Sequence, residues 1–130
     1  MNDLSRTLML SASGMQAQAG RLRHVSENIA NADTPGYRRK IAAFDTEAGM
    51  GALAGKVTLG VTRLDPADLP RIHDPGHPMA DASGNYLGSN VDLMVEIADA
   101  REAQRSYEAN LKMFDQARQM NQSLLDLLRR

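Results

Sequence analysis

The stretch Asn28-Ile-Ala-Asn-Ala-Asp-Thr-Pro-Gly-Tyr37 decides how this 130-residue chain folds, because a helical pattern stops here and an extended segment begins. Proline disfavours helical geometry at the residue before it and has no amide hydrogen, so the upstream helix must end before Pro35. The residues from Thr34 to Tyr37 suit a type II turn, with proline second and glycine supplying the positive φ at the third position. We expect this corner to set the angle at which an N-terminal helix enters the middle of the chain.

Upstream of the corner, apolar residues recur every seven positions, which is the 3.5-residue spacing of a coiled-coil seam. Ser11 and Gln18 place polar groups in the interleaved row, which costs stability but restricts the register and the partners that the seam tolerates. The alternative is a mildly kinked helix that packs only within its own domain. The heptad row is Leu8, Met15, Leu22 and Ile29, and the interleaved row is Leu4, Ser11, Gln18 and Val25.

A second, longer helix is predicted from Val91 to Leu128, which contains no glycine and no proline. Ser89 or Asn90 is expected to cap its first turn. At 1.5 Å per residue it would run roughly 57 Å against about 43 Å for the N-terminal helix, so its last turns would expose apolar surface unless something covers them. Its two seam rows are Leu93, Ala100, Tyr107, Phe114, Asn121 and Leu128, and Ile97, Gln104, Leu111, Arg118 and Leu125.

The middle of the chain predicts short strands and loops. Residues 37–44 suit a strand that begins with the basic triplet 38–40, which we interpret as a solvated face or a salt-bridging edge rather than an anion site. Residues 57–62 alternate apolar and polar side chains, as a half-buried strand does, and could pair with 37–44 in a ribbon that needs a covering helix. Residues 45–55 suit a loop, and four prolines between Pro66 and Pro78 predict an irregular, extended connection.

Together these patterns predict a mainly α fold with a small β-containing middle. Residues 1–31 and 90–130 would pair as one helical coiled-coil domain, and residues 32–89 would join them through a hairpin and a proline-rich loop. The composition agrees, because two Phe, three Tyr and no Trp leave the apolar content in aliphatic and methionine side chains, which suit helix seams.

Composition also excludes several classes of protein. The net charge is −1 and no segment carries a concentrated basic patch, which argues against nucleic-acid binding. The absence of cysteine excludes disulfides and cysteine-bound metals. No apolar run approaches the roughly 20 residues that cross a bilayer, so no membrane insertion is expected. The N-terminus does not match a cleavable signal peptide, and any export is expected to use a route without signal cleavage.

We find no catalytic motif, and we expect neither an enzyme nor a site for a cofactor or small-molecule substrate. His73, Asp74 and His77 could in principle ligate a divalent metal. They lie in a proline-rich loop without a fourth ligand or a defined spacing motif, so this metal-dependent enzyme is only an alternative hypothesis.

Two sets of residues resemble a known family. Ser13-Gly-Met-Gln-Ala-Gln18, Arg21-Leu22 and the segment 26–38 resemble the N-terminal signature of bacterial flagellar rod and hook proteins. Segments 74–81, 89–93 and 105–110 are similar to a proximal rod protein of this flagellar basal-body rod family. The resemblance covers most of the chain and is least over residues 45–65. The chain departs from this proximal rod protein at residues 32–37, where such proteins often carry extra residues. Its compact corner is similar to that of another short rod protein, which stays open as an alternative.

This resemblance implies a structural subunit of the flagellar basal-body rod. Such a subunit is exported unfolded by the flagellar type III apparatus without signal cleavage, and joins copies of itself and other rod subunits in a tube that crosses the periplasm and transmits torque. A helical export chaperone or adaptor remains an alternative, and the sequence does not say whether the terminal helices pair within or between chains. The resemblance implies assembly contacts at Leu8, Met15, Leu22, Ile29, Tyr107, Leu111, Phe114 and Leu125, and a signature corner at Asn28, Asn31, Pro35, Gly36 and Tyr37.

Overall fold

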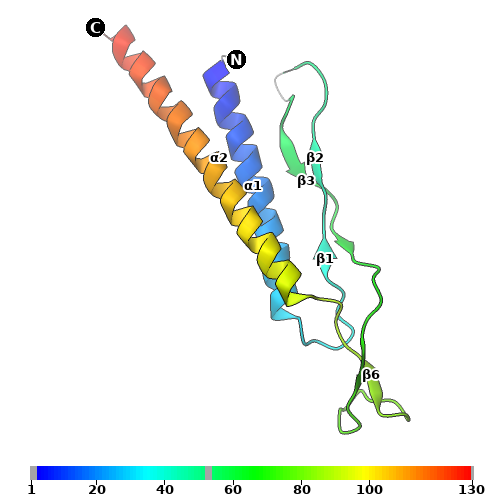
Figure 1. Ribbon diagram of the computed structural model, residues 1–130. Coiled ribbons are helices and arrows are strands. Elements are labelled where there is room, and N and C mark those ends of the chain that lie inside the picture. The colour runs from blue at the N-terminus through cyan, green and yellow to red at the C-terminus, as the bar shows by residue number, and fades with distance from the viewer. Residues whose placement is uncertain (1–2, 52–53, 130) are drawn as a thin grey trace.

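The computed structural model describes residues 3–51 and 54–129, and it shows two long helices side by side with a thin β ribbon along one of them (Figure 1). Helix α1 spans Asp3–Ala30 and helix α2 spans Leu93–Leu128. The predicted mainly α fold with a small β middle is therefore confirmed. Residues 1, 2 and 130 of the predicted helical segments and residues 52 and 53 of the predicted loop lie outside the described residues.

The two helices run antiparallel and differ in length. Asn28 near the end of α1 bonds to Glu96 near the start of α2, and Gly14 lies against Asn110. The same register places the first described turn of α1 beside residues near 121 of α2. Because α1 has 28 residues and α2 has 36, the last turns of α2 extend beyond the first turn of α1 (Figure 1).

The start of α2 differs from the prediction. Its N-cap is Asp92, whose carboxylate accepts a hydrogen bond of 3.0 Å from the amide of Met94. The prediction that Ser89 or Asn90 caps this helix is wrong, because tertiary contacts occupy both side chains. The Ser89 hydroxyl donates to the carbonyl of Ala32, and the Asn90 carboxamide accepts from the amide of Arg39 at 2.7 Å.

The predicted ribbon is present, but a bulge breaks it into two ladders. Strand β1 (Lys40–Ile41) pairs with β4 (Arg63–Leu64), and β2 (Phe44–Thr46) pairs with β3 (Val57–Leu59), both antiparallel. Ile41 faces Arg63 while Phe44 faces Leu59, so residues 42–43 lie opposite residues 60–62. One extra residue on one strand is a β-bulge, which ends the continuous strands predicted over 37–44 and 57–62.

A glycine makes this bulge possible. The amide of Gly60 donates to the carbonyl of Ala43 at 2.7 Å, and a Cβ at residue 60 would lie only 2.9 Å from that oxygen. A larger residue would push the two backbones apart, so the bend in the ribbon depends on the missing side chain.

The proline-rich segment contains a hairpin that the sequence did not predict. Strand β5 (Arg71–His73) pairs with β6 (Asn85–Leu87), so the expectation of an irregular connection is wrong over these residues. Pro70 and Pro75 flank β5 rather than interrupt it, and the strand keeps its amide donors. Asp81 closes the turn by accepting hydrogen bonds from the amides of Ser83 and Asn85.

Helix α1 lies between the ribbon and α2. One of its sides packs on the ribbon and another packs on α2. Its ribbon side carries Ser13, whose hydroxyl accepts from the amide of Val57 at 3.2 Å, and Gly20, which lies against Leu59. Among the described residues, the fully buried apolar side chains are few and mostly small. They are Ala17, Val25, Ala103 and Ala117.

Candidate functional site

The corner is held by a polar cluster that we call the hub, made of Asn28, Tyr37, Arg39, Lys40 and Glu96. Asn28 is 1% exposed and uses both ends of its carboxamide. Its oxygen accepts from the Lys40 amide at 2.8 Å and from the Tyr37 hydroxyl at 2.9 Å. Its nitrogen donates to the Lys40 carbonyl at 3.0 Å and to Glu96 Oε2 at 3.3 Å. One side chain therefore ties α1, the corner, β1 and α2 together.

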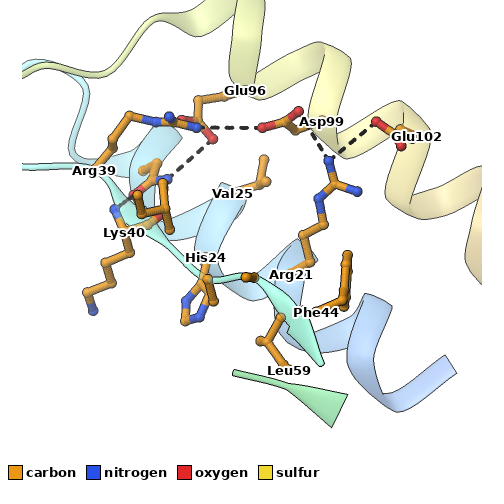
Figure 2. A pocket seen from close by; sticks show the side chains of 14 residues that line it. Arg21, His24, Val25, Arg39, Lys40, Phe44, Leu59, Glu96, Asp99 and Glu102 are labelled. Carbon is orange, nitrogen blue, oxygen red and sulfur yellow. Dashed lines mark hydrogen bonds and ion pairs between the residues drawn. The ribbon is translucent and has the colours of Figure 1, made fainter. Parts of the chain in front are cut away.

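Glu96 is the most deeply buried charged residue of the hub, with no exposed surface. Arg39 Nε donates to Glu96 Oε1 at 2.7 Å, and the same guanidinium forms an ion pair with Asp99 at 3.5 Å (Figure 2). It also forms an ion pair with Asp65 at 3.2 Å. Burial by itself would lower the pKa of Arg39, but Glu96 and Asp65 outweigh it and the pKa is raised. A buried carboxylate is tolerated when such a partner and further hydrogen bonds compensate it.

The rest of the basic triplet is also used within the chain. Lys40 Nζ lies 2.6 Å from Glu27 Oε2, and this hydrogen bond lowers the pKa of Glu27 and raises that of Lys40. Arg38 donates to the backbone carbonyls of Asp65 and Ala67. Of the two interpretations of the triplet, the structure supports the salt-bridging edge.

The turn itself has the predicted geometry. Gly36 has a φ of 74°, and the amide of Tyr37 donates to the carbonyl of Thr34 at 3.2 Å. The Gly36 amide faces the second hairpin, donating to the carbonyl of Leu87 at 3.1 Å. Asn31 donates to the carbonyl of Glu27 at 2.8 Å and so satisfies one of the last carbonyls of α1. The structure thus brings the predicted corner residues together and docks them on β6.

The sequence analysis located Asn28 and Tyr37, but it missed Glu96, which bonds to Asn28, and Arg39, which bonds to Glu96. Arg39 is part of the basic triplet 38–40 in the sequence, and Glu96 lies in the predicted helix from Val91 to Leu128 without any local signal of burial. The available signal was that Glu96 begins a heptad row of small and polar residues, Glu96, Ala103, Asn110 and Ala117. In a close helix pair, such a row can face the partner helix.

The helix pair in fact meets along rows one position before the predicted ones. Arg21 crosses the interface to Asp99 at 3.2 Å and to Glu102 at 3.4 Å, and a Cβ on Gly14 would lie 2.8 Å from the Asn110 side chain. Small residues allow this close approach, whereas leucine and methionine would hold the backbones apart. The facing rows are Thr7, Gly14, Arg21 and Asn28 on α1, and Glu96, Ala103, Asn110 and Ala117 on α2.

The eight residues predicted as assembly contacts lie beside this interface. We call them the seam strip. Helical periodicity places Met15 about 160° around α1 from the ribbon-facing Ser13, so the strip lies on the side of the helix pair away from the ribbon. Ile29, Leu111 and Leu125 are 40%, 41% and 53% exposed. The half-buried members are Leu8, Met15, Leu22, Tyr107 and Phe114.

The last turns of α2 form an apolar overhang. Leu124, Leu125, Leu127 and Leu128 are all at least half exposed, and Leu128 is 82% exposed. No other described part of the chain covers them. Contiguous apolar surface of this kind is typical of a site that binds another protein.

Other places in the described chain offer little chemistry. A hollow of about 330 Å³ between α1, α2 and the ribbon is lined by four of the five hub residues and by residues of both helices and of the ribbon, which include Arg21, Asp99 and Phe44 (Figure 2). His73 bonds to Asn85 and His77 stacks on Tyr86. Within residues 3–51 and 54–129, no group of three acidic or histidine side chains is placed to hold a metal ion. Neither described helix is apolar over a length that could span a bilayer.

Comparison with known proteins identifies both ends of the chain. Residues 8–38 match the family described as flagella basal body rod protein, and residues 82–127 match the C-terminal region of flagellar basal body rod FlgEFG proteins. The chain is 42% identical to the flagellar basal-body rod protein FlgC of Agrobacterium fabrum, over 99% of this chain and 98% of the relative. It is 32% identical to FlgC of Salmonella typhimurium, over 91% and 92% of the two chains, and 29% identical to FlgC of Bacillus subtilis, over 93% and 95%.

The two matched segments meet in space at the hub. Asn28 and Tyr37 belong to the first segment and Glu96 to the second, and they are joined through hydrogen bonds. The ribbon, which lies between the segments in sequence, packs on the outer side of α1 (Figure 1).

Proposed function

Since the chain belongs to the family of flagellar basal-body rod proteins and is of the FlgC type, we propose that the seam strip is its contact surface for neighbouring rod subunits. Members of this family are structural proteins of the flagellar basal body rather than enzymes, and they assemble with other rod subunits. The chain is accordingly a structural rod subunit, and its activity is to hold neighbours in place.

The exposure of the seam strip is the observation that carries this proposal. The hub and the facing rows already join α1 to α2 through polar and small residues. The apolar heptad rows are therefore only partly buried within the subunit, and Leu111 and Leu125 stay 41% and 53% exposed. Apolar side chains at heptad spacing are suited to packing between the side chains of another helix.

The hub gives the proposed contact its rigidity. It ties the corner to α2 through Asn28 and Glu96 and to the second hairpin through Gly36. A load applied to the helix pair would reach the ribbon and the hairpin through these bonds. Rigid coupling is what a torque-transmitting tube requires of its subunits.

The resemblance supports the finer parts of the proposal. The relatives that match over nearly the whole chain are FlgC proteins, which favours a proximal rod position over that of another short rod protein such as FlgB. Export by the flagellar type III apparatus, without a cleaved signal, would deliver the chain to a rod in the periplasm. None of the reported relatives supports the export chaperone or the metal-dependent enzyme as an alternative.

The test uses the absence of cysteine in the wild-type chain, which makes any introduced thiol unique. Leu111→Cys, labelled with a maleimide photocrosslinker in assembled basal bodies and irradiated, should form adducts with neighbouring subunits. The matched control is Lys112→Cys, the next residue of α2, which lies about 100° further round the helix and should form none. If Leu111→Cys reacts only within its own chain, or if Lys112→Cys links subunits equally well, the seam strip is not the contact surface.

A further inference from the structure

We propose that the hub, together with Arg21, is a register lock for the helix pair. It prevents α2 from sliding along α1 by seven residues, a movement of about 10.5 Å, into a register in which α1 would cover the apolar overhang. The lock keeps Leu124 and Leu128 available to a partner, and without it the subunit would bury them itself. The inference concerns contacts within one chain and does not depend on which partner the overhang binds.

The polar bonds between the two helices gather at the hub end. Asn28 of α1 donates to Glu96 Oε2 at 3.3 Å. Arg21 of α1 forms ion pairs with Asp99 at 3.2 Å and with Glu102 at 3.4 Å. All three acids belong to the part of α2 nearest its start. A slide of seven residues would separate each acid from its partner, so each of these bonds selects the observed register.

The far half of the interface does not select that register in the same way. Ser11 is 2% exposed, yet its hydroxyl oxygen has no hydrogen-bond partner among the described residues. Because buried polar groups normally find a partner, this residue does not favour the observed pairing. Gly14 makes room for the side chain of Asn110, and the same room would admit the smaller Ala117, which lies seven residues further along the row. The far half therefore tolerates a shift by one heptad.

The shift would bury apolar surface of the overhang. Leu124 continues the facing row of α2 seven residues beyond Ala117, and Leu128 lies four residues further on the same side of the helix. These two leucines are 50% and 82% exposed. In the shifted register Leu124 would take the place of Ala117 opposite Thr7, and Leu128 would lie level with the start of α1. The hydrophobic effect therefore favours the shift.

What the shift would lose at the hub end is mainly polar. It would move the first turns of α2 past the end of α1, but Leu93, Met94 and Ile97 are already 48%, 77% and 44% exposed. Glu96 would move from complete burial into water and leave Asn28 and Arg39 behind. The connection from β6 would not be stretched, because α2 would slide toward the second hairpin (Figure 1). The polar bonds at the hub end are thus the contacts that oppose the slide.

The distance between two spin labels reports the register. Arg23→Cys on α1 and Gln119→Cys on the polar face of α2 place two exposed labels in a chain that otherwise has no cysteine. In the observed register, which pairs Gly14 with Asn110, the labels should lie about 27 Å apart along the helix axis, and the shift would reduce this to about 17 Å. Double electron–electron resonance on the purified full-length chain measures the difference.

The chain with an intact lock should give the longer distance alone. Glu96→Ala with Arg21→Ala removes the bonds of the lock and should move the distance distribution to values up to about 10 Å shorter. The matched control, Asp115→Ala with Arg118→Ala, also removes one acid and one arginine, but from an exposed ion pair within α2, and should keep the longer distance.

A further pair of substitutions tests what drives the slide. Leu124→Ser with Leu128→Ser, added to the unlocked chain, should restore the longer distance, because the shifted register would then bury no additional apolar side chain there. A short distance that persists without the two leucines would overturn the proposed role of the overhang.

Two other outcomes would overturn the inference. One is an unlocked chain that keeps its helices, as measured by circular dichroism, and shows only the longer distance. The other is an equal change of distance in the matched control. If the unlocked chain loses its helices, Arg21→Ala alone leaves the buried part of the hub in place. A second peak at the shorter distance in that variant supports the lock, and a single peak at the longer distance overturns it.

Discussion

The two ends of the helix pair are built in opposite ways. At the hub end, Asn28 and Glu96 are buried and joined by hydrogen bonds, and Arg39 neutralises the carboxylate. At the far end, Leu124, Leu127 and Leu128 lie in the open, and the described chain offers them no partner. Polar groups are buried where the subunit must hold its own shape, and apolar groups are exposed where it is expected to bind another subunit.

Because of this contrast, residues at the hub should contribute to the free energy of folding, and residues at the far end should contribute to the free energy of assembly. A buried ion pair is sensitive to loss of one partner, whereas an exposed apolar side chain contributes little to the folded monomer. Substitutions at the hub should therefore change the stability of the isolated chain. Substitutions at the far end should leave stability unchanged and affect only the rod.

The largest expected effect is at the hub. Arg39→Met leaves Glu96 buried without its cation, which should lower the free energy of unfolding by about 3–5 kcal/mol. Urea unfolding of the purified chain, followed by circular dichroism, measures this change. The control Arg118→Met removes an exposed ion pair with Asp115 and should cost less than about 1 kcal/mol. Equal losses in the two variants would contradict the contrast between the ends.

The next effect is at the corner. Gly36 has a φ of 74° with open space around its Cα, so Gly36→Ala should cost about 1–2 kcal/mol from backbone strain alone. Gly51→Ala is the control, because residue 51 also has open space but no positive φ, and it should be neutral or slightly stabilising.

Motility assays on Pro35→Ala with Gly36→Ala test whether the corner matters for assembly. Intact rods in that double variant would show that it does not.

Acid should lower the free energy of unfolding by protonating carboxylates at and beside the hub. Lys40 lowers the pKa of Glu27, and the amide of Ala67 together with Arg39 lowers the pKa of Asp65. A carboxylate with a lowered pKa stabilises the folded state above its ordinary pKa of about 4, and this contribution is lost as the pH falls through the folded value. The urea concentration at the unfolding midpoint should therefore decrease as the pH is lowered below about 4. Lys40→Met should reduce this acid dependence, and an unchanged pH profile would exclude the contribution of Glu27.

The smallest effect on stability is expected at the far end. Leu125→Asp should change the free energy of unfolding by less than about 0.5 kcal/mol, because the side chain is 53% exposed and has no described partner outside α2. The same change should abolish rod assembly and swimming, because it places a charge in the seam strip. The control Gln119→Asp, on the polar face, should preserve both. A loss of stability in Leu125→Asp would mean that the far end belongs to the fold.

Local chemistry made part of this structure predictable. Pro35 and Gly36 admit few backbone conformations, and the observed turn is the one they favour. Heptad spacing located both helices, and alternation located the ribbon. The hairpin of β5 and β6 could not be read in the same way, because its prolines lie just outside β5 and mask a strand only three residues long.

The sequence by itself determined where the chain turns, which segments are helical and which family it resembles, since these depend on neighbouring residues and their spacing. Only the tertiary structure decided which side of each helix is buried. A heptad pattern defines rows of residues but leaves the rotation of a helix open, and here Gly14 and Ala103 let the helices approach closely, so that the leucine rows lie beside the interface and are only half-buried. The burial of Glu96 follows from the same rotation, because it depends on Asn28 and Arg39, which are distant in sequence and adjacent only after folding.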